Sequence, residues 1–526
     1  MGPILGRLGG YLPPFLAFLL PTLFLPTAED SFILPRASIV VVGACVGVGL
    51  ALVSPAGPSL GRQRWPLGAA ALAALLAFAF SINWSLSFIG SYSRYESLPM
   101  RLGYVGLFAG AVWLMTDRRQ RELVPAAAVL GTSIACLEAI QQWAAQVPFR
   151  PDGNLGNANL LAALVAMAVP VALYRGLRGG QFIVAWWIGI AVMAAGIWVT
   201  TSRSGAVGAL AGCLALAVVS VRGRLALPVR LACGAAVAAA LVLIETTPLK
   251  ALNEDPPSLR LHLWQDGLRL IAARPLTGWG EDVTGLTFGG FLRHDYASLV
   301  SFDRLHSGPL DLAATQGVIG LAATGWVLAV LVRSGWKWRH TGGVGPLLAA
   351  CAGYSAWVTF NFDWAPATGV FWLLAGTAWS VIRAEERESV AAEPAVGSPA
   401  MPAAIRSLLA LALALAAVGV GALPLLADSW YLQGRADLSV IVDPLQARYH
   451  WGLGQALEAQ GSVAGGVAQM QRAASLGEST PLLYIELGDS EAQLGRVEEA
   501  RKAYLRALEI DPYFRPARTR LAALNA

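Results

Sequence analysis

The chain has 526 residues, of which 56% are hydrophobic and only 13% are charged, and its mean hydropathy is +0.56. A wholly soluble protein cannot bury that much apolar surface, whereas a bilayer accepts it through apolar helices of roughly twenty residues. Loop arginines explain the net charge of +5, so the charge does not indicate a nucleic-acid partner. The five cysteines all lie in apolar runs and form no CxxC pair, so they predict neither a disulfide nor a metal site.

Thirteen apolar stretches predict an all-α, polytopic membrane bundle of twelve or thirteen helices. They span 8–26, 37–53, 66–82, 102–116, 123–147, 158–174, 181–201, 205–221, 226–244, 307–332, 344–361, 364–382 and 403–427. No small-residue cleavage site follows the first stretch, so we interpret it as a membrane helix and not as a removed signal peptide.

Positive charge gathers in alternate loops. Counted from a cytoplasmic N-terminus, every second loop is rich in arginine, for example at Arg118, Arg119 and Arg121, and the loops between them carry far fewer. This is the pattern of cytoplasmic loops. With thirteen helices it predicts that the long segment 245–305 and the C-terminus both lie on the outer face.

The C-terminal segment repeats itself. Leu487 and Gly488 follow Leu453 and Gly454 by 34 residues, the period of a helical tetratricopeptide repeat, which typically offers a groove to a protein partner. The expected layout is a membrane domain over 1–382, a flexible cytoplasmic linker over 383–402, an additional membrane helix over 403–427 and a repeat domain over 428–526.

Two outer loops combine polar and aromatic residues. The segment 81–101, with Arg94 and Arg101, suits contact with a sugar or a lipid head group, or else an interfacial aromatic belt. The segment 151–164 places Asn157 and Asn159 at the start of a helix. These asparagines either contact substrate or simply cap the helix.

A cation stands in the short turn between two apolar helices, in "VTTSRSGAVGAL" (199–210). Arginine near the hydrocarbon boundary costs on the order of a few kcal/mol unless it snorkels or has a partner. A phosphate would suit the planar donor fork of Arg203, and Ser202 and Ser204 add hydroxyls. We therefore favour an anionic ligand here, with snorkelling as the alternative.

The long outer segment begins with a helix near 258–271. At 100° per residue its polar face holds His262, Gln265, Asp266 and Arg269, and its apolar half holds Leu261, Leu263, Trp264, Leu268, Leu270 and Ile271. Arg260 falls within the apolar half, so we expect it to point toward the membrane domain. Arg203 and Arg260 would then neutralise a diphosphate together, and we expect Trp264 and Arg269 to contact the same substrate.

His306 stands at the outer mouth of the tenth helix and is the histidine best placed to act as a general base, with Asp303 and Asp311 as candidate orienters. A lone histidine at a helix start is also compatible with a merely interfacial role. No acidic metal triad is evident, and we expect neither a metal nor a cofactor. Glu245, Glu254 and Asp255 leave a metal-dependent enzyme as an alternative.

These stretches, taken in order, resemble the O-antigen ligase and polymerase superfamily of bacterial membrane glycosyltransferases. The carriers are "GNLGNANLLAAL", "TTSRSG", "LRLHLWQDGLRLIAARPLTGWG" and "RLHSGPLDLAATQGVIGL", within the membrane domain. The resemblance implies transfer of a glycan from undecaprenyl diphosphate to an acceptor hydroxyl of a lipid, glycan or protein. It also implies a bacterial inner-membrane protein with a periplasmic site, no metal, and inversion at the anomeric carbon. This chain departs from the family in having Ser307 where asparagine commonly follows the histidine.

Within this resemblance, Arg203 and Arg260 would hold the diphosphate and His306 would take the acceptor's proton. Ligase, polymerase and protein O-oligosaccharyltransferase remain alternatives. So do a transporter for the same lipid-linked glycan and a non-catalytic assembly scaffold, although the membrane portion lacks the internal repeat that many transporters show.

Overall fold

The computed structural model describes residues 8–54, 59–221, 257–293, 302–389 and 401–524, with a few single positions between 223 and 235. The described residues are almost entirely helical and contain no strand, which confirms the predicted fold class. The membrane-domain elements are α2 (Leu12–Thr22), α3 (Ile33–Val53), η1 (Gly61–Gln63), α4 (Arg64–Ala79), α5 (Trp84–Ile89), α6 (Leu98–Leu114), α7 (Arg118–Ala144), α8 (Ala158–Arg178), α9 (Ile183–Thr200), α10 (Arg203–Ser220), α12 (Pro257–Ala273), α13 (Thr284–Thr287), η4 (Phe288–Phe291), α14 (Gly308–Trp338), α15 (Val344–Val358) and α16 (Ala365–Ser389). They are followed by α17 (Ala403–Ala416), η5 (Ala417–Ala422), α18 (Leu423–Leu432), α19 (Ala436–Val442), α20 (Ala447–Ala459), α21 (Val463–Leu476), α22 (Pro481–Gln493), α23 (Val497–Ile510) and α24 (Arg515–Leu524).

Among the described residues, eight helices are long and apolar enough to cross a membrane, namely α3, α7, α8, α9, α10, α14, α16 and the continuous helix from Ala403 to Leu432. Three shorter apolar helices, α2, α6 and α15, accompany them. Twelve of the thirteen predicted stretches therefore overlap a described helix, whereas the ninth, 226–244, falls outside the described residues apart from isolated positions. The chain is a multi-pass membrane protein.

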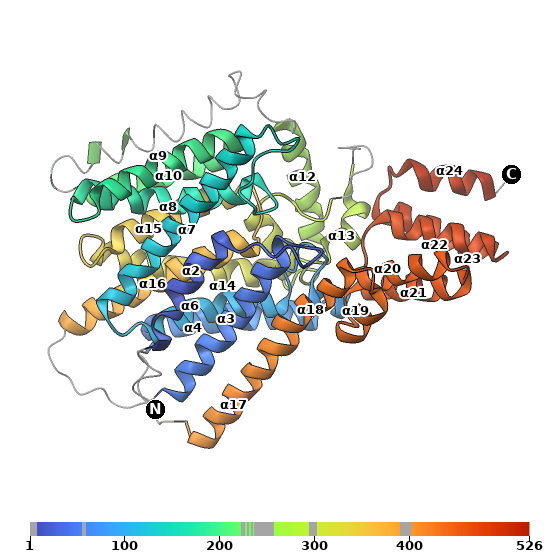
Figure 1. The fold of residues 1–526 in the computed structure, drawn as a ribbon, viewed down its shortest axis with the longest axis horizontal. Coiled ribbons are helices and arrows are strands. Elements are labelled where there is room, and N and C mark those ends of the chain that lie inside the picture. The colour runs from blue at the N-terminus through green and yellow to red at the C-terminus, as the bar shows by residue number, and fades with distance from the viewer. Residues whose placement is uncertain are drawn as a thin grey trace.

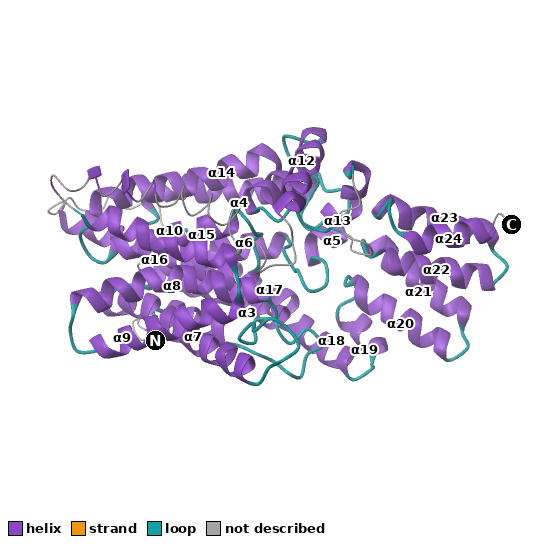
Figure 2. Cartoon of the chain, turned by 90° about the horizontal axis from the view of Figure 1, so that it is seen from above, coloured by secondary structure: helices purple, strands orange, loops and turns teal. Residues whose placement is uncertain are grey.

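The helices of the membrane domain lie side by side, and the C-terminal helices project from one end of it (Figure 1). A view from above shows the same separation, with α20 to α24 beyond the loops of the bundle (Figure 2). We call the end of the membrane domain that meets these helices the repeat end, and the opposite end the far end. From α2 to α10, and again from α14 to α17, successive described membrane helices run alternately toward one end and the other.

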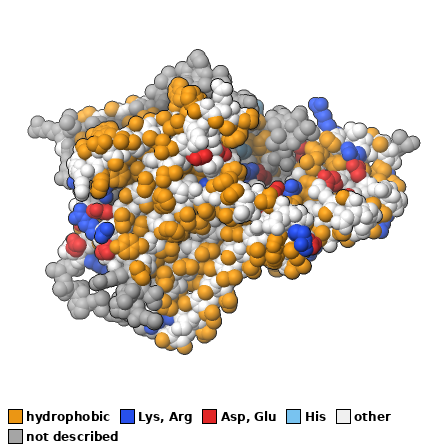
Figure 3. All heavy atoms as spheres, viewed as in Figure 1, with side chains coloured by type: hydrophobic (Ala, Val, Ile, Leu, Met, Phe, Trp, Pro, Cys, Tyr) orange, Lys and Arg blue, Asp and Glu red, His pale blue; other side chains and the backbone are white. Residues whose placement is uncertain are grey.

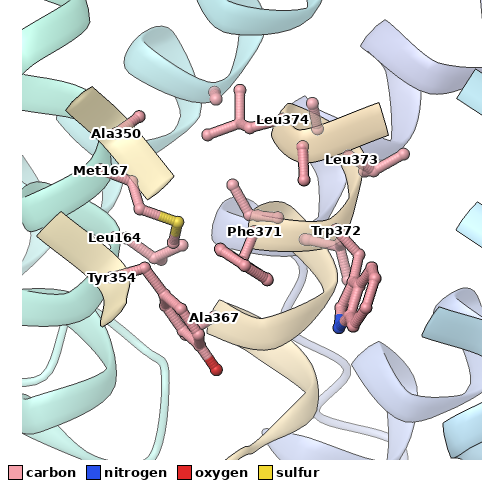
Figure 4. Close-up of a cluster of buried hydrophobic side chains, with 14 of the residues drawn as sticks. Leu164, Met167, Ala350, Tyr354, Ala367, Phe371, Trp372, Leu373 and Leu374 are labelled. Atoms are coloured by element: carbon pink, nitrogen blue, oxygen red, sulfur yellow. The ribbon is translucent and has the colours of Figure 1, made fainter. Parts of the chain in front are cut away.

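Helix α16 is the centre of the bundle. Every residue in its most apolar 18-residue window is buried. Phe371 stacks on Tyr354 of α15 at 4.5 Å between ring centroids, and Figure 4 shows these two rings among side chains from α8, α15 and α16. Aromatic and aliphatic side chains thus fill the space between these helices, and this packing fixes where the loop between α15 and α16 emerges at the repeat end.

Glycines bring α8, α10 and α15 into close contact. A Cβ atom on Gly353 would lie 2.4 Å from the carbonyl oxygen of Ala166, and one on Gly208 would lie 2.9 Å from the carbonyl oxygen of Gly353. Small residues allow such backbone approach between helices in a membrane. Because α10 runs away from the repeat end and α15 runs toward it, this contact sets the start of α10 beside the end of α15.

Two predicted boundaries fall elsewhere in the structure. Helix α16 continues to Ser389, so the first residues of the segment expected as a linker are helical, and residues 390–400 lie outside the described part. The last membrane helix continues to Leu432 through a π-helical turn at Ala417–Ala422. Helix α17 buries none of its residues and diverges from the bundle in Figure 1, where α3 is its neighbour.

The C-terminal helices pack in pairs, α20 against α21 and α22 against α23. Tyr484, Ala500, Tyr504 and Ala507 are buried in a shared core. A Cβ atom on Gly488 would lie 2.3 Å from the ring of Tyr504, so this position requires glycine. Small residues and aromatics therefore perform the packing roles expected from the 34-residue period.

The repeats are joined to the membrane domain by polar contacts. Asp428 of α18, fully buried, accepts hydrogen bonds from the Asp30 amide at 2.8 Å, the Tyr92 hydroxyl at 2.8 Å and the Tyr449 hydroxyl at 3.0 Å. The side chain of Asn83 also donates to the carbonyl of Ser475 in α21. The repeats are thus held directly against the loops of the repeat end.

Candidate functional site

The three residues expected to carry the chemistry come from segments that meet at the repeat end around the α15–α16 loop. A guanidinium nitrogen of Arg260 (Nη1) donates to the carbonyl oxygen of Phe360 at 3.0 Å. The ring of His306 lies 5.3 Å from that of Phe362, centroid to centroid. Arg203 is the first residue of α10, whose glycine contact with α15 places it beside the same loop.

Helix α12 packs against the membrane domain in an orientation that agrees only in part with the prediction. Arg260 points toward the membrane domain, as predicted, and the ring of Trp264 lies 6.1 Å from that of Phe360. The expected split into an apolar docking half and a polar solvent face is wrong: Leu261 and Leu268 are more than half exposed, whereas Asp266 is buried. Asp266 faces inward because its carboxylate accepts the Arg293 amide at 3.0 Å. It also pairs with Arg269, a residue that was predicted to contact the substrate.

His306 stands in a constrained turn. Its φ of 52° lies in the left-handed region, which is costly for a residue with a Cβ atom. Asp311 fixes this turn, since its carboxylate accepts the Leu305 amide at 2.7 Å and its own amide donates to the Ser307 carbonyl at 2.7 Å. The rings of Phe302 and Phe362 approach the imidazole edge to face. Strain of this kind, supported on several sides, is typical of functional positions.

A partly buried ion pair lies next to His306, with the side chains of Arg94 and Asp303 25% and 34% exposed. Asp303 accepts two hydrogen bonds from Arg94, at 2.6 and 3.2 Å, and the Arg94 guanidinium also stacks 4.7 Å above the ring of Trp364. Burial alone would raise the pKa of Asp303, but the charge and hydrogen bonds of Arg94, aided by nearby His306, lower it. Asp303 therefore stays ionised beside His306.

Arg101, expected to contact substrate, is held by carboxylates. It contacts Asp363 at 2.7 Å, Glu281 at 3.2 Å and Glu96 at 3.7 Å, and its side chain is one-tenth exposed. Burial raises the pKa of Glu96 to about 7, although Arg101 and a hydrogen bond from Tyr104 act in the opposite direction. This network connects the start of α6 to the loops before α13 and α16. It thereby stabilises the loops that surround the site.

The asparagines and serines expected to bind substrate bond to one another. Asn157 caps α8 by accepting the Asn159 amide at 2.8 Å, and the Asn159 side chain accepts the Ser202 hydroxyl at 2.7 Å. Ser202 in turn caps α10 and lies 3.4 Å from the hydroxyl of buried Ser204. Together they link the starts of α8 and α10 and thereby orient Arg203.

The α15–α16 loop, "TFNFDW", was not predicted as part of the site, because the apolar stretches 344–361 and 364–382 include all but two of its residues. Its two phenylalanines, aspartate and tryptophan contact Arg260, His306, Arg101 and Arg94 respectively. The dense aromatic and acidic content of a loop this short was the available signal. The fully buried pair of Arg304 and Asp282 was not predicted from the sequence either. Within the described residues, no three His, Cys, Asp or Glu side chains are grouped as a metal site.

Comparisons with known proteins identify two regions. Residues 188–325 match the family model described as O-Antigen ligase, and residues 481–514 match that of the tetratricopeptide repeat. The first match includes Arg203, Arg260 and His306, and the second covers α22 and α23. No curated protein matches the chain. The resemblance to O-antigen ligases and the prediction of a C-terminal tetratricopeptide repeat are thereby confirmed.

Proposed function

We propose that this multi-pass membrane protein, with its O-antigen ligase region and C-terminal tetratricopeptide repeat, transfers a glycan from undecaprenyl diphosphate to an acceptor hydroxyl. The reaction is metal-independent and inverting, and takes place at the repeat end, on the periplasmic face of the bacterial inner membrane. The observation that carries the proposal is the meeting of Arg260 and His306 on one loop, beside the helix that starts with Arg203.

In the proposed reaction the acceptor oxygen attacks the anomeric carbon and forms the new glycosidic bond. The bond between that carbon and the diphosphate oxygen breaks, and undecaprenyl diphosphate leaves with the electron pair. Arg203 and Arg260 stabilise the charge on the leaving diphosphate, because guanidinium groups bind phosphate oxygens with two parallel donors. His306 takes the acceptor's proton as general base, and ionised Asp303 stabilises the imidazolium that results.

The remaining predicted residues divide into two roles in this proposal. Trp264 and the cluster of Asn157, Asn159, Ser202 and Ser204 line or support the diphosphate side, in the first half of α12 and at the starts of α8 and α10. Arg269, further along α12 and paired with Asp266, supports that helix. Arg94 acts through Asp303 and Phe362 to position His306. Arg101 stabilises the loops before α13 and α16. Arg94 and Arg101 are thus positioning residues in the proposal.

A protein acceptor, as in protein O-oligosaccharyltransferases, is favoured by one observation over a lipid or a growing glycan. The repeat helices pack directly on loops that neighbour the site, since Asn83 bonds to Ser475 and a Cβ atom on Gly285 would lie 2.7 Å from the hydroxyl of Ser479. Tetratricopeptide repeats commonly bind peptide segments. A protein partner held there would have its hydroxyl side chains close to His306.

The decisive experiment incubates the purified full-length protein with undecaprenyl-diphosphate-linked glycan, candidate acceptors and a chelator, and identifies products by mass spectrometry. We expect transfer to persist with chelator and to fall by about 10²- to 10⁴-fold in His306→Gln, with lipid-linked glycan still bound. His340→Gln, a histidine substitution at the far end, is the matched control and should leave the rate unchanged. Strict metal dependence would contradict the proposed mechanism and favour a metal-dependent enzyme, and full activity of His306→Gln would exclude His306 as the general base. No transfer by the unaltered protein would favour a transporter or scaffold.

A further inference from the structure

The far end of the membrane domain contains a pocket that plays no part in the proposed transfer. It has a volume of about 200 Å³ and lies between the start of α7, the end of α8, the α14–α15 turn and the end of α16. Six charged side chains line it: Arg118, Arg121, Arg175, Glu122, Glu385 and Glu388. Figure 3 shows charged side chains of both signs gathered at this end of an otherwise apolar surface.

The charges that face one another across the pocket do not close into ion pairs. Arg118 pairs with Glu122, but both belong to α7 and lie along the same helix face. Arg175 makes no hydrogen bond or ion pair with any residue that the structure describes, and the same holds for Glu385 and Glu388. Opposite charges within reach of each other usually pair, so their separation around a pocket indicates that each sign is available to a ligand.

Helix dipoles do not explain most of these charges. The first turn of α7 carries arginines and no acidic residue, whereas the last turns of α16 carry Glu385 and Glu388. These are the unfavourable signs for those two helix ends, whereas Arg175, in the last turn of α8, carries the favourable one. Arginines in a cytoplasmic loop follow the positive-inside tendency, but the glutamates opposite them do not. A ligand that carries both a negative and a positive group accounts for the arginines and the glutamates together.

The α14–α15 turn adds backbone donors to the arginine side. Gly342 and Gly343 line the pocket with φ of 55° and 81°, and Gly343 is the N-cap of α15 with no side-chain cap. The amides in the first turn of such a helix favour an anion. A Cβ atom on Gly342 would lie 2.7 Å from a carboxylate oxygen of Glu385, so this turn is close to the acidic side of the pocket as well.

We propose that this pocket binds the head group of a zwitterionic phospholipid, one that carries a phosphate and an ammonium group, as phosphoethanolamine lipids do. The phosphate lies against Arg121, Arg175 and the start of α15, and the ammonium against Glu385 and Glu388. The three arginines and three glutamates cancel in charge, which disfavours a purely anionic ligand. Apolar residues complete the lining and suit the glycerol and upper chains of a lipid, namely Pro125, Val171, Pro346, Leu347, Val381 and Ala384.

The test uses the full-length protein, delipidated in detergent and then titrated with phosphatidylethanolamine, phosphatidylglycerol or free phosphoethanolamine, with adducts counted by native mass spectrometry. We expect phosphatidylethanolamine to bind more tightly than phosphatidylglycerol, and Arg175→Gln and Glu385→Gln each to weaken it about tenfold. Arg119→Gln removes the same charge as Arg175→Gln at the same end of the domain, between the pocket residues Arg118 and Arg121, but Arg119 does not line the pocket. This variant should bind as the unaltered protein does.

Thermal melting provides a second measurement that does not depend on adduct survival. Phosphatidylethanolamine should raise the melting temperature of the unaltered protein and of Arg119→Gln, but not that of Arg175→Gln. The proposal fails if the unaltered protein binds the two lipids equally well and Glu385→Gln prefers phosphatidylglycerol. The site would then bind anions in general. The proposal also fails if free phosphoethanolamine binds as tightly as the lipid, or if neither variant changes binding.

Discussion

The two ends of the membrane domain contain the same types of charged residue and use them in opposite ways. At the repeat end, Arg94 is closed onto Asp303, Arg304 onto Asp282, and Arg101 onto three carboxylates, all in largely buried surroundings. At the far end, Arg175 faces Glu385 and Glu388 across a pocket without contact. A closed, buried pair fixes the geometry of neighbouring loops, whereas charges held apart remain available to a ligand.

The difference has a physical cause in what each end must do. Burying an arginine and a carboxylate costs desolvation energy that only close contact and additional hydrogen bonds offset, so such pairs stay closed. They therefore suit a site whose histidine must keep one orientation. A pocket for an exchangeable lipid requires side chains that remain partly solvated before the ligand arrives, as the half-buried Arg175 does.

The largest effect is expected at Arg101. Arg101→Gln leaves Glu281 and Asp363 with an uncompensated buried charge, which typically costs about 3–5 kcal/mol. We expect a large drop in melting temperature in detergent and loss of folded protein on size exclusion. A melting temperature close to that of the unaltered protein would show that this network does not support the repeat end.

A smaller loss is expected where the repeats join. Asp428→Asn weakens the acceptor for the Asp30 amide and for the hydroxyls of Tyr92 and Tyr449, at about 1.5–3 kcal/mol for hydrogen bonds to a charged group. Hydrogen exchange should increase in α18 to α20 while α16 stays protected. Asp437→Asn, an exposed residue of α19, is the matched control and should leave exchange in α18 and α20 as it was. Unchanged exchange in Asp428→Asn would mean that apolar contacts alone hold the repeats.

The sequence predicted the helices well because apolar stretches and repeats leave local signals. Twelve stretches overlapped described helices, and Arg260 points toward the membrane domain as expected, although the apolar and polar faces predicted for its helix did not hold. Partners distant in sequence could not be read in this way. Nothing local indicated that Arg101 would meet Glu281 and Asp363, or that Asp266 would turn inward to accept the Arg293 amide, because both depend on how loops pack after the helices assemble.

The pH dependence of stability should separate the two ends further. Burial raises the pKa of Glu96 to about 7, so its contribution to stability is fully present below its ordinary pKa and is lost as the pH rises through about 7. Between pH 6 and pH 8 the loss is on the order of 1 kcal/mol. Glu96→Gln cannot ionise and should therefore reduce the drop in melting temperature over this interval. An equally steep drop in Glu96→Gln would place the titrating group elsewhere.

The smallest change in stability is expected at Arg175. In lipid-free detergent Arg175→Gln should alter the free energy of unfolding by no more than about 0.5 kcal/mol, since no ion pair with a described residue is lost and the side chain keeps access to solvent. The informative comparison is with Arg101→Gln, because the two substitutions remove the same charge at opposite ends of one domain. If Arg175→Gln destabilised the lipid-free protein as strongly, its charge would already be compensated within the fold, and the distinction between closed and open charges would not hold.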